Sequence, residues 1–407
     1  MTQAHEPLAQ RLVQRALGAV QGGSLRVSTS GQARTYGQGE PEVRLTVHDP
    51  AFYRRLALQG SIGAGESYMD GLWDCDDLVA LVRIMARNRP ALERLEGWAA
   101  APAALADAWG HWRRRNSKRG SRRNISAHYD LGDGLFRLFL DERMMYSAAV
   151  FDCGDETLDE ASEAKLARLC QKLELQPGDH LLEIGCGWGG LALFAAQRFG
   201  CRVTAITISE AQHQCASRLV AENGLADQVE VKLCDYRDLR GRYDKLVSVE
   251  MIEAVGHEYL NAYFRACARL LRPDGLMAMQ AIVIRDSAYR RALRRADFIK
   301  KHIFPGGFMP SVSVLTAAAA KADLSLANLE DLALDYALTL REWRRRLDAN
   351  AARAQALGFD ERFVRLWRFY FAYCEGGFLE RAISDVQMLF TMPGRRGPVW
   401  RVPLEKP

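Results

Sequence analysis

The stretch His180-Leu-Leu-Glu-Ile-Gly-Cys-Gly-Trp-Gly-Gly190 decides the fold of this chain. It begins as a short apolar strand that contains one acid, Glu183, and continues through a glycine turn into an apolar helix over residues 191–199. Glycine lets the backbone turn sharply and approach a ligand that a Cβ atom would exclude. The amides at the start of the helix point back at whatever occupies the turn. The stretch therefore predicts a nucleotide-type binding site at the end of a strand.

Strands and helices alternate regularly beyond this turn. We expect strands at 202–208, 229–233, 244–249 and 276–284, with helices at 210–223 and 258–271. This alternation predicts an α/β fold, a parallel sheet with helices on both faces. In such a sheet the ligand lies at the carboxyl ends of the strands, where the strand order reverses. The glycine turn and the segments 207–210, 235–238 and 250–256 should therefore surround one crevice.

The pattern around the glycines favours S-adenosylmethionine over a dinucleotide. A dinucleotide site has GxGxxG with an acid about 20 residues further on, whereas here Glu183 precedes the glycines and no acid stands at the tip of the next strand. A P-loop is excluded because the sequence lacks GK[ST]. We expect Glu183 to support the amino-acid end of the cofactor, and Asp235 and Tyr236 to hold the adenine edge.

The rest of the chain predicts three parts. Residues 1–95 are expected to form a small α/β docking domain, with helices at 12–20, 51–58 and 78–88, strands at 26–30 and 42–48, and a glycine-rich turn at Gly60, Gly63 and Gly65. Residues 96–123 are Ala-rich and then Arg-rich and predict a basic linker. Residues 124–407 are the predicted catalytic domain. It contains a long insertion at 286–330, a strand at 325–335, helices from 340 and 360, and a strand at 387–392. Residues 144–151 are core or a lid over the site.

Composition limits the class of protein. The chain has 407 residues, 48% of them hydrophobic and 26% charged, as in ordinary globular proteins. No apolar run reaches the roughly 18 residues that a membrane span needs, and the first residues do not predict a secretory signal. The nine cysteines are dispersed without ligand spacing, so we expect reduced thiols, a cytoplasmic protein and no metal site.

Positive charge is gathered in three clusters although the net charge is only +5. The clusters are residues 111–123, the set Arg290, Arg291, Arg294, Arg295, Lys300 and Lys301, and the set Arg341, Arg344, Arg345 and Arg346. One such cluster is usually a solvated face, but three favour a polyanionic partner, either nucleic acid or an anionic membrane. No aromatic-basic module or Asn/Asp-Pro-Pro-Tyr motif supports nucleic acid.

The motifs together resemble those of the cyclopropane fatty acid synthase family, which includes the mycolic acid cyclopropane synthases. The resemblance covers about residues 124–392. It rests on 128–132 (HYDLG), 145–147 (MYS), 182–190 (LEIGCGWGG), 207–209 with Gln212, 235–239 (DYRDL), 248–256 (SVEMIEAVG), Tyr263-Phe264, 303–307 (IFPGG), Tyr336 and 373–378 (YCEGGF). It implies a class I methyltransferase fold with a helical lid, an N-terminal lipid-docking domain and a homodimer. It also implies an enzyme at the inner face of the cell membrane.

The resemblance implies the reaction and its residues. The family methylates the double bond of unsaturated acyl chains of phospholipids with S-adenosylmethionine, and a bound bicarbonate takes the proton whose loss closes a cyclopropane ring. Aromatic faces stabilise the intermediate cation. The implied catalytic set is Glu253, Gln280, Ile282 (by its backbone), Tyr336 and Cys374. The implied cofactor set is Tyr129, Tyr146, Ser147, Glu183, Gly185, Gly187, Trp188, Gly189, Gly190, Thr207, Ser209, Gln212, Asp235, Tyr236, Arg237 and Glu250. For Cys374 a structural thiol is the favoured interpretation, since the chemistry needs no covalent step.

Two positions depart from the family pattern. Ala148 stands where the family has Cys, and Gln280 stands where it has His. Both changes weaken the expected bicarbonate site, so a methyl- or methylene-branched product is an alternative to the ring. A small-molecule or nucleic-acid methyltransferase and a non-catalytic, cofactor-binding lipid-docking protein are the further alternatives.

Overall fold

The computed structural model describes residues 8–89 and 132–399. These residues divide into two compact units. One contains residues 8–89, 294–305 and 340–382, and the other contains residues 132–293, 306–339 and 383–399. Tyr129 and the basic cluster at 111–123 lie outside the described residues.

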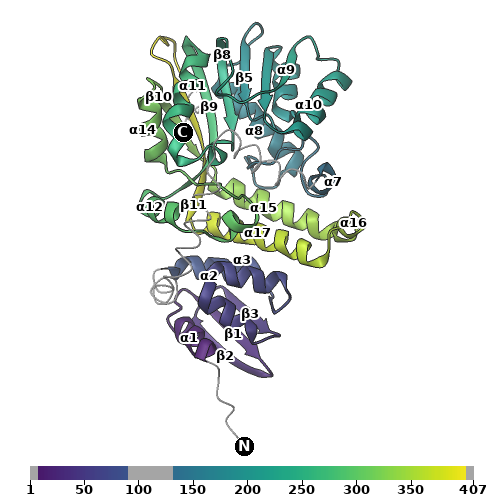
Figure 1. Cartoon of the computed structure of the whole chain (residues 1–407), viewed down its shortest axis with the longest axis vertical. Coiled ribbons are helices and arrows are strands. Elements are labelled where there is room, and N and C mark those ends of the chain that lie inside the picture. The colour runs from purple at the N-terminus through teal and green to yellow at the C-terminus, as the bar shows by residue number, and fades with distance from the viewer. Residues whose placement is uncertain (1–7, 90–131, 400–407) are drawn as a thin grey trace, which may run out of the picture. The chain divides into compact units, whose positions relative to one another are not determined.

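The larger unit is built on a seven-stranded sheet (Figure 1). Its strands are β5 (His180–Ile184), β6 (Arg202–Thr207), β7 (Val229–Leu233), β8 (Tyr243–Val249), β9 (Leu271–Ile284), β10 (Ser325–Asp331) and β11 (Ile383–Thr391). The order is β10-β11-β9-β8-β5-β6-β7. Strands β5 to β9 are parallel, while β11 runs antiparallel to both β9 and β10. The chain leaves β5 toward β6 and β7 and returns to β8 on the other side of β5, so the strand order reverses between β5 and β8.

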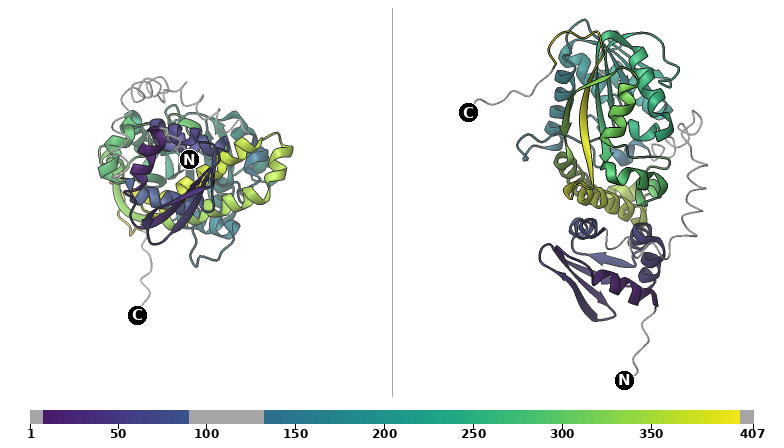
Figure 2. Two further views of the ribbon diagram at one scale, coloured as in Figure 1. Left: turned by 90° about the horizontal axis from the view of Figure 1, so that it is seen from below. Right: turned by 90° about the vertical axis from the view of Figure 1, so that its left-hand side faces the viewer.

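Helices cover both faces of this sheet, as Figure 2 shows in its right-hand view. They are α8 (Leu158–Lys172), α9 (Gly190–Phe199), α10 (Glu210–Glu222), α11 (Leu260–Leu270) and α14 (Val312–Ala320). Shorter pieces are α7 (Asp133–Phe136), η1 (Ile252–Ala254), η2 (His257–Tyr259) and α12 (Asp286–Arg294). The α/β class and the parallel sheet with helices on both faces are confirmed.

Helix α8 has no counterpart among the expected elements. Its start is well marked, because Thr157 and Glu160 cap the first turn reciprocally. Its inward face, however, carries Lys165 and Lys172, both of them buried. Charged residues on the buried face interrupt the apolar 3.6-residue period that identifies an amphipathic helix, and this hides α8 in the sequence.

The smaller unit contains a four-stranded sheet in the order β2-β1-β3-β4. The strands are β1 (Gly23–Thr29), β2 (Gln32–Gln38), β3 (Glu42–Val47) and β4 (Trp73–Cys75). In β3 alternate residues are buried, namely Val43, Leu45 and Val47, which is the period of a half-buried strand. Strand β2 was not expected from the sequence, because its residues are nearly all polar and exposed.

Helices from three stretches of the described chain contribute to this unit. They are α1 (Leu8–Leu17), α2 (Ala51–Met69), α3 (Leu78–Arg87), α13 (Phe298–His302), α16 (Ala351–Ala356) and α17 (Glu361–Leu379), with the later part of α15 (Ala333–Ala349). The glycine-rich turn expected at Gly60, Gly63 and Gly65 is wrong. These glycines lie inside α2, which is kinked at Gly60. A Cβ atom on Gly65 would meet the rings of Phe298 and Phe369 at 2.4 and 2.9 Å, so glycine serves close packing there.

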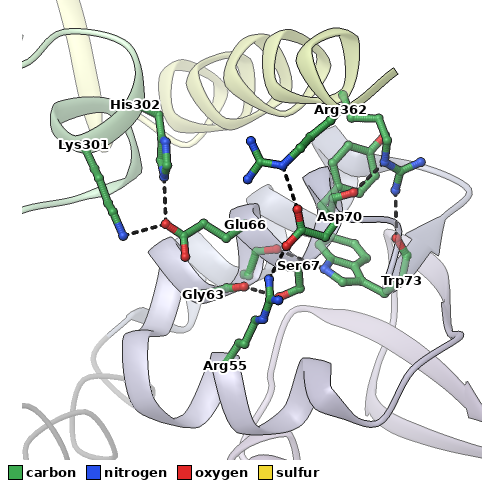
Figure 3. A network of polar contacts seen from close by, with 12 residues as sticks. Arg55, Gly63, Glu66, Ser67, Asp70, Trp73, Lys301, His302 and Arg362 are labelled. Atoms are coloured by element: carbon green, nitrogen blue, oxygen red, sulfur yellow. Dashed lines mark hydrogen bonds and ion pairs between the residues drawn. The ribbon is translucent and has the colours of Figure 1, made fainter. Parts of the chain in front are cut away.

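Ion pairs join segments of the smaller unit that are far apart in the sequence (Figure 3). Glu66 on α2 accepts hydrogen bonds from Lys301 and His302, at 2.5 and 3.0 Å. Asp70 lies between Arg55 and Arg362 at 2.5 and 2.8 Å. The two cations beside Glu66 oppose the effect of its burial and hold the pKa of its carboxyl below the ordinary value. Within this unit, α2 is thereby held to both α13 and α17.

Candidate active site

The glycine turn lies at the carboxyl end of β5, next to the point where the strand order reverses. Gly185, Gly187 and Gly189 all have positive φ, at 86°, 51° and 92°, a region that residues with a Cβ avoid. A Cβ on Gly185 would come within 2.8 Å of Met251, and one on Gly189 within 3.0 Å of Ala216. Gly187 differs, because a Cβ there would meet no protein atom within 4 Å. The turn is therefore packed on two sides and open above Gly187.

Glu183 supplies an acceptor beneath this opening. Its side chain is 3% exposed, and its Oε2 atom has no hydrogen-bond partner among the described residues. Burial raises the pKa of the Glu183 carboxyl to about 8, although Lys165 and the Ala192 amide oppose the shift. A buried, unpartnered carboxyl oxygen beside an open glycine turn fits a ligand with an ammonium group, as S-adenosylmethionine has.

The polar residues after β6 mostly satisfy one another. The Thr207 hydroxyl donates to Gln212 Oε1 at 2.8 Å, and Ser209 caps α10 by accepting from the Gln212 amide. After β7, Asp235 is bound by Arg237, whose Nε and Nη2 atoms donate at 2.8 and 2.6 Å. The Tyr236 ring packs edge-on against Tyr263 in the core. These residues border the crevice, and the contacts named here are made with neighbouring protein groups.

An aromatic cluster lies on the N-terminal side of the turn. Trp188 donates from its indole nitrogen to Asp133 at 2.8 Å, and its ring lies 4.9 Å from Phe136 between centroids. Tyr146 meets the Phe136 ring edge-on at 5.3 Å. Most of residues 144–151 are buried, so this segment belongs to the core as well as bordering the site. Ser147 accepts a hydrogen bond from Lys165 Nζ at 2.7 Å.

The proposed catalytic residues meet around Glu250, which directly follows β8. Its Oε1 atom accepts from the Ala148 amide at 2.7 Å and from Gln280 Nε2 at 2.9 Å. Its Oε2 atom accepts from the Tyr336 hydroxyl at 2.7 Å. Glu253 follows Glu250 by three residues, and its Oε1 atom accepts from the amide of Ile282 at 2.6 Å. Ile282 lies on the same strand as Gln280. The structure thus joins Gln280 and Tyr336 through Glu250, a residue that the sequence assigned to the cofactor.

Burial dominates the electrostatics of this group. It raises the pKa of Glu253 to about 8, with a further upward contribution from Glu250. It also raises the pKa of Glu250, against four opposing influences: Tyr336, the Ala148 amide, Lys165 and Gln280. Asp385 on β11 is fully buried, and the same cause raises its pKa well above the ordinary value. Buried acids with perturbed pKa values beside a ligand crevice are typical of active sites.

Cys374 lies on α17, in the smaller unit. Burial raises the pKa of its thiol, and Asp297 raises it further. A neutral thiol is a poor nucleophile, so the interpretation of Cys374 as a structural thiol is kept.

Sequence reasoning missed Lys165, Lys172, Asp385 and Gln387. Lys172 Nζ donates to Gln387 Oε1 at 2.7 Å, and Gln387 Nε2 donates to Gln280 Oε1 at 3.0 Å. A sequence marks such residues only indirectly, as a lysine or a carboxamide at a position where the hydrophobic periodicity of the helix or strand predicts a buried apolar residue.

The basic clusters differ in how many of their side chains are exposed and how many are paired with acids. Arg290 and Arg291 on α12 are exposed. In the third cluster, Arg341 and Arg344 pair with Glu375, and Arg345 and Arg346 pair with Glu342. Lys300 is buried. Among the two clusters within the described residues, internal acids therefore neutralise the third, and α12 presents exposed arginines.

No helix in residues 8–89 and 132–399 is long and apolar enough to cross a membrane.

Comparison with known proteins agrees with this geometry. The profile of the family described as mycolic acid cyclopropane synthetase matches residues 116–388. The chain is 39% identical over 354 residues to the tuberculostearic acid methyltransferase of Mycobacterium tuberculosis, covering 82% of this chain and 80% of that one. It is 35% identical over 357 residues to the cyclopropane-fatty-acyl-phospholipid synthase of Escherichia coli K12, covering 87% and 89%.

Among solved structures, a mycolic acid cyclopropane synthase complexed with SAH and CTAB is similar, with a TM-score of 0.62 and 33% identity. The similarity covers 66% of this chain and 98% of that one. SAH is the demethylated form of the methyl donor that the glycine turn and Glu183 fit.

Proposed function

The chain belongs to the mycolic acid cyclopropane synthetase family, and from that premise we propose that it methylates the double bond of unsaturated acyl chains in membrane phospholipids. It is an S-adenosylmethionine-dependent methyltransferase of the cyclopropane synthase type. The alternative of a non-catalytic docking protein is therefore not supported. What remains to be proposed is the substrate, its presentation and the roles of individual residues.

One observation carries the proposal most directly. Met251 contacts the glycine turn, since a Cβ on Gly185 would approach its Cγ to 2.8 Å. Glu250 and Glu253 stand on either side of Met251 within the same short loop and are half-buried. The acids that can accept a proton therefore adjoin the turn that holds the methyl donor. An alkene is a weak nucleophile, so holding donor and double bond in near-attack geometry is the main source of rate.

We propose these roles for the residues of the crevice. Gly185, Gly187, Gly189 and Gly190 provide the bare backbone over which the cofactor lies, and Glu183 holds its ammonium group. The rings of Tyr146 and Trp188 border the cofactor, and those of Tyr146 and Tyr336 face the cation that forms on the acyl chain. S-adenosylmethionine supplies an electrophilic methyl group when it is bound.

The proposal is tested by incubating the protein with S-adenosylmethionine labelled in its methyl group and vesicles of monounsaturated phospholipid. Label in the acyl chain is the expected result, and vesicles of saturated phospholipid are the control. No transfer to unsaturated lipid under conditions in which the cofactor binds would refute the proposed substrate.

The identity of Ala148, Gln280 and Glu250 favours a second candidate product, a methyl- or methylene-branched chain, besides the cyclopropane ring. Both products begin with the same methyl transfer. Proton NMR of the extracted lipid separates them, because only the ring gives cyclopropane signals. A relative named tuberculostearic acid methyltransferase supports keeping this candidate.

We further propose that the protein binds peripherally to anionic membrane at the inner face of the cell membrane. Residues 1–95 act as the docking domain, 96–123 as a basic linker and 124–407 as the catalytic domain. The exposed Arg290 and Arg291 support contact with lipid head groups, because exposed basic side chains near an anionic surface each contribute about 1 kcal/mol. A homodimer is the assembly that the resemblance implies, and light scattering of the purified protein tests it.

A further inference from the structure

The backbone of Glu250 is unusual. Its φ is 45°, in the left-handed region that a residue with a Cβ rarely adopts. Strain of this kind persists only where the surroundings hold it, and it gathers at functional sites. The surroundings here are three hydrogen bonds to the Glu250 carboxylate from three separate segments, those of Ala148, Gln280 and Tyr336. The structure thus maintains an unfavourable backbone in order to direct this carboxylate inward.

The Glu250 carboxylate accepts hydrogen bonds from residues that were expected to bind bicarbonate. Ala148, Gln280 and Tyr336 stand at three of the positions that the family resemblance assigns to the anion, and all three donate to Glu250 instead. A bicarbonate ion among them would lie within hydrogen-bond distance of a second anion, with Glu253 and Asp385 also nearby. Like charges in a buried site destabilise each other strongly. The residues present therefore do not fit bicarbonate.

A chain of side chains fixes the direction of the Gln280 amide. Lys172 carries an ammonium group that can only donate, so the oxygen of Gln387 must face it. The NH2 group of Gln387 then faces the oxygen of Gln280, and the NH2 group of Gln280 faces Glu250. Lys172, which Glu330 holds at 2.6 Å, fixes the Gln387 end of this chain, and at the other end the NH2 group of Gln280 also donates to the Ala148 carbonyl at 3.2 Å.

We propose that the Glu250 carboxylate is the proton acceptor of this enzyme in place of bicarbonate, and that Lys172 acts through Gln387 and Gln280 as a positioning residue for it. This inference rests on the proposed methyl transfer to an acyl double bond. It applies to the ring and to the methylene-branched product alike, because each requires loss of a proton from the added methyl group.

The step balances without a further reactant. The alkene electron pair forms a C–C bond to the donor methyl as the S–CH3 bond breaks, and a cation remains on the acyl chain. A C–H bond of the new methyl then breaks. Its electrons close the ring, or form a double bond after a hydride shift, and its proton goes to an oxygen of Glu250. The carboxyl loses this proton to solvent before the next turnover.

The first test compares the wild-type protein with Glu250→Gly and Glu250→Gln in buffer depleted of carbon dioxide. Glycine adopts the left-handed conformation freely and leaves an anion-sized space beside the Ala148, Gln280 and Tyr336 donors, whereas Gln fills that space with a neutral amide. We expect wild-type transfer to be unaffected by added bicarbonate. We expect about 100-fold slower transfer in both variants, with partial recovery of Glu250→Gly alone when formate or bicarbonate is added.

Two outcomes would overturn the inference. One is a wild-type rate that falls on depletion and returns with bicarbonate. The other is a Glu250→Gly variant that binds S-adenosylmethionine and turns over at the wild-type rate without added anion. A wild-type protein that methylates no lipid at all would instead refute the proposed function. Calorimetric binding of the cofactor confirms that each variant is folded.

The second test separates positioning from a merely structural role. Lys172→Met removes the group that orients Gln387, while Arg168→Met is its matched control, since Arg168 also pairs with Glu330 but donates to neither glutamine. The titratable groups facing Glu250 are Lys165, Tyr336, Glu253 and Asp385. Without Lys172 the Gln387 amide can turn, so that only the Ala148 carbonyl still orients the Gln280 amide and Gln280 stabilises the anion less. The rising limb of the pH–rate profile should then move up by about one pH unit in Lys172→Met and stay in place in Arg168→Met. An equal loss of rate at every pH, or the same shift in both variants, would refute the positioning role.

Discussion

Substitution of Gly187 by Ala should weaken cofactor binding while leaving the fold intact. Gly187 lies shortly before α9 and Gly200 directly after it, with φ of 51° and 65°. A Cβ on Gly187 would meet no protein atom within 4 Å, and one on Gly200 would meet only Pro177 at 3.7 Å. Neither alanine therefore clashes with the protein. The left-handed backbone alone costs each variant about 1 kcal/mol, which lowers the melting temperature by about 2–4 °C for a unit of this size.

The two variants should differ in binding. The added methyl of Gly187→Ala projects into the space that the cofactor would fill, whereas that of Gly200→Ala lies at the far end of the helix. Forcing one extra methyl into a close-packed contact costs about 1–3 kcal/mol, which corresponds to about 5- to 150-fold weaker binding. Calorimetric titration with S-adenosylmethionine measures this, and scanning fluorimetry measures the stability of both proteins. Equal affinities in the two variants would show that the cofactor does not lie over the glycine turn.

Three further predictions concern the acids and the surface. Tyr336→Phe removes the hydroxyl that donates to Glu250, and a hydrogen bond to a charged group contributes about 1.5–3 kcal/mol. The rising limb of the pH–rate profile should therefore move up by about one to two pH units, and an unshifted limb would contradict the contact. Burial raises the pKa of Glu183 to about 8, so the folded state binds more protons than the unfolded chain between about pH 4.5 and 8, and stability falls as pH rises through that window. Glu183→Gln should flatten the fall in melting temperature from pH 5 to 9, and an unchanged slope would count against the raised pKa. Arg291→Glu should weaken sedimentation with anionic vesicles at low salt. Arg345→Glu should have less effect, because the native arginine pairs with Glu342, and equal effects of the two variants would argue against α12 as a membrane contact.

Periodicity allowed most of the catalytic sheet to be predicted. Strands β5, β6 and β8 are rich in apolar residues, whereas β7 alternates apolar and charged residues. The observed positions of all four agree with the sequence-based expectation to within a residue or two. Helix α8 escaped because Lys165 and Lys172 interrupt its apolar face. The glycines of α2 indicate a turn in the sequence, but Gly60 forms a kink within the helix and Gly65 packs against the rings of Phe298 and Phe369. A local pattern does not reveal contact with rings from distant segments.

The cofactor side of the site was more predictable than the proton-accepting side. The acid–glycine–helix pattern around Glu183 follows from local sequence. The role of Glu250 depends on where its side chain points, and that depends on donors from three segments between 30 and 102 residues away. Glu250 and Glu253 stand in one short loop, so their order in the sequence gives no reason to choose between them.

Their surroundings do distinguish these two carboxylates. Glu250 accepts from three donors on other segments and faces Lys165. Glu253 accepts from the Ile282 amide, and its Oε2 atom has no partner among the described residues. Hydrogen bonds to the charged form favour ionisation, and a second buried anion opposes it. Ionisation of Glu250 therefore keeps Glu253 protonated, which agrees with a Glu253 pKa of about 8. Two neighbouring acids whose environments separate their pKa values can take different roles. The hydrogen bonds that favour the charged form are gathered on Glu250 and suit it to accept a proton, whereas the surroundings of Glu253 favour its protonated form.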